Sequence, residues 1–432
     1  MTTSSSTSGS AAGIAGVEPY TDHTPPRSEA QANAIAEFVK NHGVDLDWVD
    51  PFYKWMHENP ELSREEVETA AHVKERLDQM DCEVTTDIGG HGITAVFRNG
   101  EGPTILMRAD FDALPVQETT GLPWASKKDG VMHACGHDAH TSSLIGLCAI
   151  MNERRDAWRG TFIALFQPAE EVTEGATAMV NDGLSQKIPT PDICLGQHIV
   201  AGPAGTVFSA PGPVLAACDT ITITLTGKSA HGSAPHLSLD PSYLAAMIVV
   251  RLQGIVGREV APSEFAVITV GSLIAGHTNN TIPDTATLVL NCRFYNTEVR
   301  DATYAAIERV VRGECEASGC TVPPEIVYSA HGELTDNSPE VFRKVRPVFD
   351  ATFGEESADA EPWTASEDFS EIPRRFGVPY FFWTLGVTDR ELWNSGEDVP
   401  GNHSGNFAPA PGMVTRGIEA ATAAVLSYLW KS

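Results

Sequence analysis

Residues 160–171 read GTFIALFQPAEE, an uninterrupted apolar run that leads directly into two adjacent glutamates. A short continuous apolar run of this kind is typical of a strand that is buried on both faces. Similar runs occur at PTILMRADFD (residues 103–112) and at DICLGQH (residues 192–198). Helical stretches such as TSSLIGLCAIMNERR (residues 141–155) lie between them. This alternation of strands and helices predicts a mostly parallel sheet with helices on its faces.

The pattern changes near residue 216, and DTITITLTG (residues 219–227) alternates strictly between polar and apolar side chains. Such alternation is typical of a strand with one face in water. We expect a helix, two strands, a second helix and a final strand to follow in that order. The resulting β-α-β-β-α-β order indicates a ferredoxin-like unit. The predicted fold is therefore an α/β catalytic domain that is interrupted by a small α+β lid domain.

The predicted bounds are residues 1–27 for a disordered leader, 28–215 and 332–432 for the catalytic domain, and 216–331 for the lid. The leader lacks the basic start and the continuous apolar segment of a signal peptide. No apolar run approaches the ~18–20 residues that are needed to span a bilayer. The eight cysteines are scattered and include no C-x-x-C pair. We therefore expect reduced thiols and a cytoplasmic location.

The formal net charge of −28 restricts the classes of partner. The field of such a chain repels phosphate, so nucleic acid and anionic membrane surfaces are poor partners. The charge carries no information about mechanism. That information comes from the acids and histidines that follow the predicted strands.

Candidate metal ligands stand after three of the apolar runs. TILM is followed by Asp110 and Asp112, FIALF by Glu170 and Glu171, and DICLG by His198. Open α/β sheets place their active sites beyond the carboxyl ends of their strands. A random surface would not carry metal-type ligands at three strand ends, so we predict the active site at this edge of the sheet.

The stretch HACGHDAH (residues 133–140) is dense in metal-binding side chains. In extended backbone residues i and i+2 point the same way, so Cys135 and His137 can bind one metal site together. A thiolate is a strong ligand, and one that bridges two cations would explain a single cysteine. Taken separately, a buried small cysteine and a helix-capping histidine are the simpler interpretation, but their combination favours a metal site. His140 lies about one helical turn after His137 and is left unassigned.

The adjacent Glu170 and Glu171 suggest two different roles. Neighbouring side chains diverge in extended backbone, so one carboxylate can bind metal while the other faces the water to be activated. A solvated loop is the common alternative for such an acidic stretch, but here the acids directly follow a buried strand. Taken alone, His198 and His403, the latter in GNHSGNF, would be unremarkable.

A series of motifs occurs along the chain in the order HENPELSREE, RADFDALP, MHACGHDAH, QPAEE, GQH, GKSAHGSAPHLSLDP, NNTIPD, SEDF and GNHSGNF. The series resembles the M20 metallopeptidase and amidohydrolase family. Within that family it is similar to the aminoacylase and hippurate hydrolase branch, which includes bacterial N-acyl-amino-acid aminoacylases and plant auxin-conjugate hydrolases. The resemblance covers about residues 50–430.

The resemblance implies two divalent metal ions per chain, with Zn, Mn, Ni or Co as candidates. The family's metal ligands fall on Cys135, His137, Glu171, His198 and His403. Cys135 would be the bridging ligand and Glu170 the general base. Asp112 would correspond to the aspartate that hydrogen-bonds a metal-bound histidine and fixes its tautomer.

Three lid residues also match the family. His231 matches the histidine that stabilises the oxyanion. Asn280 and Arg293 match residues that hold the substrate, and Arg293 would pair with its free carboxylate. The chain departs from the usual pattern at Ser238, Ala365 and Gly405, which leaves loop shape and substrate range open.

The implied reaction is hydrolysis of the amide bond of a small N-acyl-L-amino acid to a carboxylic acid and a free amino acid. Some family members supply the lid histidine from a dimer partner, which suggests a homodimer through the lid. A dipeptidase or carboxypeptidase is the alternative within the same chemistry. A metal-binding regulator without catalysis is a further alternative, which is disfavoured because Glu170 and every ligand are present.

Overall fold

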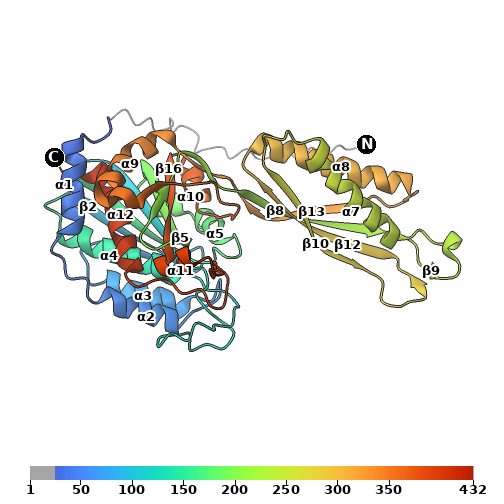
Figure 1. The fold of residues 1–432 in the computed structure, drawn as a ribbon, viewed down its shortest axis with the longest axis horizontal. Helices are drawn as coiled ribbons and strands as arrows, with labels where there is room; N and C mark the ends of the chain where they lie inside the picture. Colours follow the sequence, from blue (N-terminus) through green and yellow to red (C-terminus); the bar gives the residue numbers. More distant parts are fainter. Residues whose placement is uncertain (1–24, 432) are drawn as a thin grey trace. The chain divides into compact units, whose positions relative to one another are not determined.

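The computed structural model describes residues 25–431, which form two compact units (Figure 1). The first unit contains the described residues up to Val214, then Asp336–Glu361 and the described residues from Asp368 onward. The second unit contains Leu215–Thr335 and Pro362–Glu367. Residues 1–24, which make up most of the predicted leader, lie outside the described part of the chain.

The last residue of the predicted leader, Arg27, belongs to the folded first unit. Its guanidinium donates hydrogen bonds to the backbone oxygens of Ser427, Tyr428 and Trp430. The next residue, Ser28, begins the first helix through a capping box with Gln31. Arg27 is therefore bound to the C-terminal part of the first unit, although it falls within the bounds of the predicted leader.

A mixed eight-stranded sheet with the order β1-β2-β4-β3-β5-β16-β6-β15 forms the centre of the first unit. The inner strands β4, β3, β5 and β16 are parallel, while β1, β2 and β6 pair in antiparallel fashion. The mostly parallel sheet confirms the predicted fold class. The strand bounds are β1 Glu83–Ile88, β2 Gly92–Asn99, β3 Thr104–Asp110, β4 Gly160–Gln167, β5 Ile193–Pro203, β6 Val207–Ser209, β15 Ser357–Asp359 and β16 Tyr380–Thr388.

Helices cover both faces of this sheet. The bounds are α1 Glu29–Lys40, α2 Val49–Glu58, α3 Val67–Leu77, α4 His137–Glu153, α5 Gly175–Asn181, α6 Leu184–Lys187, α9 Pro339–Phe353, α10 Glu371–Phe376, α11 Arg390–Ser395 and α12 Met413–Leu429. On one face α4 and α12 pack against each other and against β3 and β5. On the other face α5 packs on β4 and against α10.

Strand β4 shows why the sheet needs both layers. Phe162, Ala164 and Phe166 join the core that α4 and α12 share. The intervening Ile163 and Leu165 are also fully buried, and because side chains alternate along a strand they point to the face of α5 and α10. The uninterrupted apolar run of β4 thus reflects burial on both faces, as the sequence predicted.

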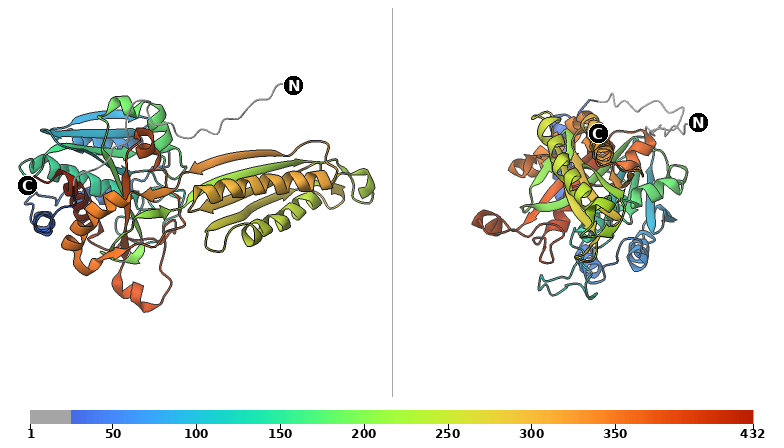
Figure 2. Two further views of the ribbon diagram at one scale, coloured as in Figure 1. Left: turned by 90° about the horizontal axis from the view of Figure 1, so that it is seen from above. Right: turned by 90° about the vertical axis from the view of Figure 1, so that its right-hand side faces the viewer.

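The second unit has the predicted ferredoxin-like order. Its elements are β8 Ala217–Thr226, α7 Pro241–Arg258, β10 Ala266–Ala275, β12 Thr285–Phe294, α8 Thr297–Ala317 and β13 Glu325–Gly332. The strands form an antiparallel sheet in the order β10-β12-β8-β13, and the two helices lie side by side on one face of it (Figure 2). A short pair, β9 (Ala230–His231) with β11 (Thr281–Ile282), adds a small second sheet.

Local sequence explains where the helices of the second unit begin. The Asp240 side chain accepts hydrogen bonds from the Ser242 and Tyr243 amides at the start of α7. Pro241 occupies the first helical position, where its missing N–H costs nothing. Asn296 caps α8 in the same way. Among the described residues, none of the helices combines the length and the apolar character that crossing a membrane requires.

Candidate metal centre

The predicted ligands gather at the carboxyl edge of the parallel strands. Asp110 is the last residue of β3, and Glu170 and Glu171 follow the end of β4. His198 differs from the prediction, because it lies inside β5 and not beyond it. The ladder between β5 and β16 continues past Thr384, which is the partner of His198, and so lengthens the strand. The pairing of Arg108 with Gly196 still places His198 level with the end of β3.

Cys135 and His137 come together for a reason that the sequence analysis did not foresee. His137 is the first residue of α4 and does not lie in an extended loop. Gly136 between them has a φ of +88°, a conformation that favours glycine. A Cβ atom at Gly136 would also lie 2.2 Å from Cδ1 of Ile199. This glycine therefore turns the buried Cys135 and His137 toward the same space.

Hydrogen bonds fix the orientation of both buried histidines. Nδ1 of His137 lies 3.2 Å from Oδ1 of Asp112, which leaves Nε2 as the metal-binding nitrogen. Nδ1 of His198 donates to the backbone oxygen of Ile199 at 2.7 Å. Its Nε2 therefore carries the lone pair, and this atom lies 3.4 Å from Sγ of Cys135.

Glu170 and Glu171 converge, whereas the sequence analysis expected them to diverge. They lie in a turn after Ala169, whose φ of +53° reverses the chain, and not in extended backbone. Oε2 of Glu170 and Oε1 of Glu171 each lie 3.7 Å from Nε2 of His137. Oε2 of Glu171 also lies 3.4 Å from Nε2 of His403. These separations exceed ordinary hydrogen-bond lengths.

The ligand-type atoms form overlapping groups, each within 4.8 Å. Three of these groups are Cys135 with His137 and His198, Cys135 with Glu171 and His403, and His137 with Glu170 and Glu171. Within the described part of the chain, Nε2 of His137 and Oε1 of Glu171 are buried without a hydrogen-bond partner. Buried polar atoms of this kind require an explanation, and a cation between nitrogen, sulfur and oxygen donors supplies one.

Electrostatics agree with a metal centre. Burial raises the pKa of the Cys135 thiol well above its ordinary value and that of the Glu171 carboxyl to about 7. Burial also lowers the pKa of His198, which favours the neutral ring. A divalent cation would bind the deprotonated forms of all three side chains. The residues therefore fit a site for divalent metal ions.

His140, which the sequence left unassigned, has both ring nitrogens engaged. Nδ1 lies 2.6 Å from Oδ1 of Asp110, and Nε2 accepts the Ile199 amide at 2.9 Å. Asp110 also pairs with the buried guanidinium of Arg108. His140 thus holds β3 and β5 together beside the cluster.

Several residues that support the cluster were missed by the sequence analysis. The ring of His57 lies 2.6 Å from the carboxylate of Asp138, the residue after His137. Ser63 and Glu66 bond to the loops that carry Asp112 and Glu170. His57, Ser63 and Glu66 belong to HENPELSREE, a stretch to which the sequence analysis gave no role. The sequence also contained a sign of these buried polar contacts, because the charged Arg108 lies inside an apolar run.

The predicted oxyanion histidine, His231, and the two predicted substrate-binding residues, Asn280 and Arg293, lie in the second unit. His231 in β9 pairs with Thr281 in β11, and the Gly232 amide donates to the oxygen of Asn280 at 2.6 Å. His231 and Asn280 are therefore neighbours. Asn280 and β11 closely precede the first residue of β12, Thr285. Arg293 lies near the other end of β12, roughly 27 Å from Thr285 at ~3.4 Å per residue. The second unit therefore does not bring Arg293 together with His231 and Asn280.

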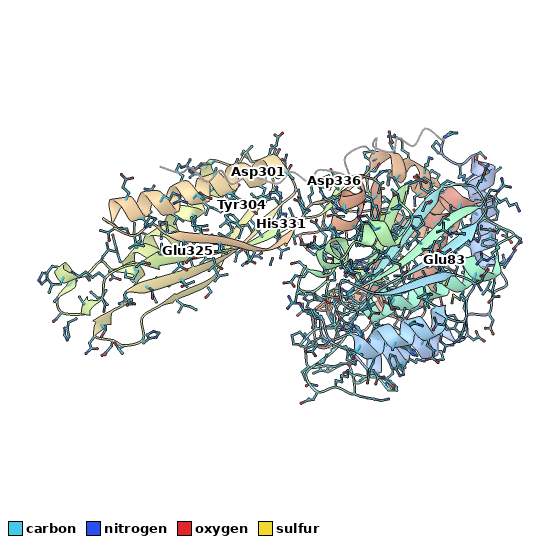
Figure 3. The ribbon with its side chains drawn as sticks, turned by 180° about the vertical axis from the view of Figure 1, so that it is seen from behind. Glu83, Asp301, Tyr304, Glu325, His331 and Asp336 are labelled. Carbon is cyan, nitrogen blue, oxygen red and sulfur yellow. The ribbon has the colours of Figure 1, made fainter. Side chains whose placement is uncertain are left out.

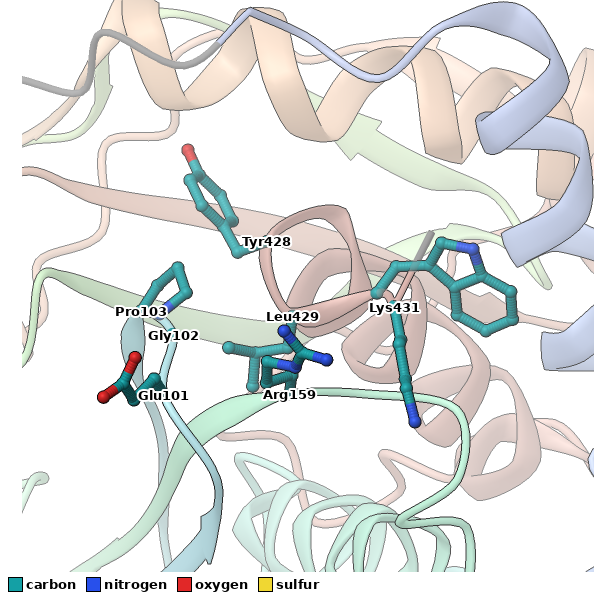
Figure 4. Close-up of a pocket in the computed structure, with 8 residues that line it drawn as sticks. Glu101, Gly102, Pro103, Arg159, Tyr428, Leu429 and Lys431 are labelled. Carbon is teal, nitrogen blue, oxygen red and sulfur yellow. The ribbon is translucent and has the colours of Figure 1, made fainter.

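A pocket lies at the opposite end of β3 (Figure 4). Its lining residues are Glu101, Gly102, Pro103, Arg159 and residues 428–431. Pro103 directly precedes the first residue of β3, whereas Asp110 ends that strand. This pocket is therefore distinct from the ligand cluster.

Comparison with known proteins identifies the family. A family model described as peptidase family M20/M25/M40 matches residues 106–408. The chain belongs to the M20 peptidase family. Among M20 relatives, hippurate hydrolase of Campylobacter jejuni is 38% identical over 318 residues, which are 73% of this chain and 82% of that protein. Thermostable carboxypeptidase 2 of Saccharolobus solfataricus is 33% identical over 379 residues, which are 86% and 93%.

A solved M20 structure supports the same assignment. A Bacillus subtilis protein described as a dinuclear metal-binding peptidase of the M20 family matches with a TM-score of 0.73 and 30% identity. The match covers 88% of this chain and 98% of that one. The family resemblance predicted from the sequence is confirmed, and the ligand cluster lies within the matched part of an M20 chain.

Proposed function

We propose that this M20 chain is a metal-dependent amidohydrolase that cleaves N-acyl-L-amino acids to a carboxylic acid and a free amino acid. The buried cluster of Cys135, His137 and Glu171 carries the proposal. Nε2 of His137 and Oε1 of Glu171 are buried without a hydrogen-bond partner among the described residues, and they lie 3.7 Å apart at the carboxyl edge of the parallel strands. The relative named hippurate hydrolase supports the substrate class.

We assign two divalent cations, Zn, Mn, Ni or Co, to one set of side chains. These are Cys135, His137, Glu171, His198 and His403, whose ligand atoms form overlapping groups. Cys135 would be the ligand that both ions share. A metal pair supplies an activated water and a polarised carbonyl when it is bound. His403 is the exposed member of the set.

Glu170 is the proposed general base. Its carboxylate lies beside His137 but is not needed to complete the ligand set. It takes the proton from the attacking water and gives it to the departing amine, the usual double role of a positioned carboxylate. The buried Asp112 holds His137 in the tautomer that leaves Nε2 for the metal.

In the second unit His231 stabilises the oxyanion, and Asn280 and Arg293 hold the substrate. Arg293 lies roughly 27 Å along β12 from Thr285, the end of the strand that follows β11 and its partner His231. Because this length exceeds the size of a small N-acyl amino acid, we infer that one copy of this unit does not contact the substrate with both residues. We therefore propose a homodimer in which His231 and Asn280 act on the active site of the partner. A dimer of this kind would make both ends of the unit functional.

A carboxypeptidase is the second candidate. The relative named thermostable carboxypeptidase 2 is 33% identical and spans 86% of this chain. Both activities hydrolyse an amide next to a free carboxylate, so the ligand cluster serves either one. The two candidates therefore differ in the group on the acyl side of the cleaved amide, which is a simple acyl group for the amidohydrolase and a peptide for the carboxypeptidase.

A substrate panel tests the proposal. N-acetyl, N-benzoyl and long-chain N-acyl amino acids are compared with dipeptides and longer peptides, with each metal added back to chelated protein. We expect the highest kcat/KM on an N-acyl amino acid, and a kcat lower by roughly 10²–10⁴-fold in Glu170→Gln. Faster hydrolysis of peptides would select the carboxypeptidase, and no hydrolysis with any metal would reject both.

A further inference from the structure

The turn that carries Glu170 is held in an unfavourable backbone conformation. Ala169 and Thr173 both have positive φ angles, +53° and +54°, which non-glycine residues rarely adopt. The turn is also tight, because a Cβ atom at Gly175 would lie 1.6 Å from the oxygen of Pro168. Such strain persists only where surrounding contacts enforce it.

Two buried carboxylates hold the amides on either side of Glu170. Oε1 of Glu66 accepts the Ala169 amide at 2.9 Å. Oδ2 of Asp112 accepts the Glu171 amide at 3.0 Å. Ser63, in the same short segment as Glu66, donates its hydroxyl to Asp112 at 2.7 Å. The backbone of Glu170 is thus clamped at both of its neighbours.

Glu66 is an unusual residue for its position in the fold. It stands at the N-cap of α3, yet its side chain makes no capping hydrogen bond. Glu66 is fully buried, and its Oε2 atom has no hydrogen-bond partner among residues 25–431. Burying a carboxylate with an unused oxygen is costly, and a cap would favour Asp, Ser or Thr. A capping role therefore does not explain this glutamate. Its carboxylate interacts with the nearby Arg64 and Glu66 amides and, across 103 residues of sequence, accepts the Ala169 amide.

We propose that Glu66 is a positioning residue that fixes the Ala169 amide and thereby aims Glu170 and Glu171 at the metal centre. The proposal rests on the proposed function for the role of Glu170. The clamp itself is a property of the fold and can be measured without a substrate.

Three variants separate positioning from folding. Glu66→Asp keeps the charge and is a better N-cap, but its carboxylate is about 1.5 Å shorter. Glu66→Gln keeps the length, and its carbonyl oxygen can still accept the Ala169 amide. Glu65→Asp is the matched control, because the adjacent Glu65 is exposed.

The readouts are kcat and KM on the best N-acyl amino acid, the dissociation constant of the added metal, and hydrogen exchange of a peptide that contains the Ala169 amide. For Glu66→Asp we expect kcat to fall roughly tenfold to 100-fold at saturating metal, with little change in KM. We also expect weaker metal binding and at least tenfold faster exchange at Ala169. Glu66→Gln and Glu65→Asp should resemble the wild type in all three.

Wild-type kcat and exchange in Glu66→Asp would overturn the proposal, because a capping role predicts that this variant is harmless. Equal losses in Glu66→Asp and Glu66→Gln would also overturn it. If the wild type hydrolyses no amide, the proposed function fails, and the exchange and metal measurements still decide the role of Glu66.

Discussion

Oδ1 of Asp112 lies 3.2 Å from Nδ1 of His137, and this contact leaves Nε2 of the ring facing both Glu170 and Glu171. The other oxygen of Asp112 accepts the Ser63 hydroxyl and the Glu171 amide. One buried carboxylate therefore orients a histidine and anchors the acidic turn.

Asp112→Asn should weaken metal binding roughly 10- to 100-fold, the usual effect of changing a partner of a metal-bound histidine. The introduced amide NH₂ would face the Glu171 N–H, or the histidine would lose its acceptor. Calorimetric titration of the chelated protein checks the change. Asp129→Asn is the control, because Asp129 is exposed in a loop. Equal affinities in the two variants would contradict the role of Asp112.

Glu170→Gln and Glu171→Gln should fail in different ways, although the two carboxylates lie equally far from His137. Glu170→Gln should keep its metal and lose roughly 10²–10⁴-fold in kcat, the range of general acid–base catalysis. Glu171→Gln should lose metal, because it also reaches His403. Metal analysis and kinetics of both variants separate the roles. Retention of metal with equal loss of activity in both would contradict them.

Arg293→Ala should harm substrates with a free α-carboxylate more than their α-amides. In the structure its Nε donates to Oδ1 of Asn291 at 3.0 Å, and the half-buried guanidinium has further donors for a carboxylate. A charge-assisted pair contributes about 1.5–3 kcal/mol, so kcat/KM should fall roughly tenfold to over 100-fold on the carboxylate substrate. Comparing N-acyl-glutamine with its α-amide tests this. An equal small loss on both would make Arg293 a scaffold residue.

The second unit should lose stability at alkaline pH through His331. Nδ1 of His331 lies 2.7 Å from Asp219, which also accepts the Tyr304 hydroxyl, and Nε2 lies 3.0 Å from Glu333. Figure 3 labels His331 and Tyr304 in the second unit. The hydrogen bond to Asp219 is the main cause that raises the pKa of His331 to about 10. Because the pKa of His331 is higher in the folded state than in the unfolded state, protonation of its ring stabilises the fold. This stabilisation is fully present below the unfolded pKa of about 6.5 and is lost as the pH rises to the folded pKa of about 10.

Urea unfolding at pH 6.5 and at pH 10 measures this contribution. The wild type should lose more stability over that interval than His331→Gln, whose side chain does not titrate. Equal losses in the two proteins would show that the network around His331 does not carry the pH dependence.

The sequence predicted most of the fold because its strongest patterns are local. The apolar run of β4 and the alternation in β8 each follow from burial on two faces or on one. The gathering of Asp112, Glu171 and His198 at one edge follows from the general position of sites in open α/β sheets.

Other features of the site depend on contacts that a local pattern does not contain. The convergence of Glu170 and Glu171 depends on the positive φ of Ala169, which an alanine does not signal. The Ala169 amide donates a hydrogen bond to Glu66, which is 103 residues away in the chain. His198 lies within a strand because β16, from the end of the sequence, extends the ladder.

Metal content and hydrolysis, measured on the same sample, test the central claim most directly. Protein purified by gel filtration should hold up to two divalent ions per chain and should hydrolyse an N-acyl amino acid. A chelator should abolish the activity, and added divalent metal should restore it. Full activity with less than half an ion per chain would contradict the assignment of Cys135, His137, Glu171, His198 and His403 as a catalytic metal centre.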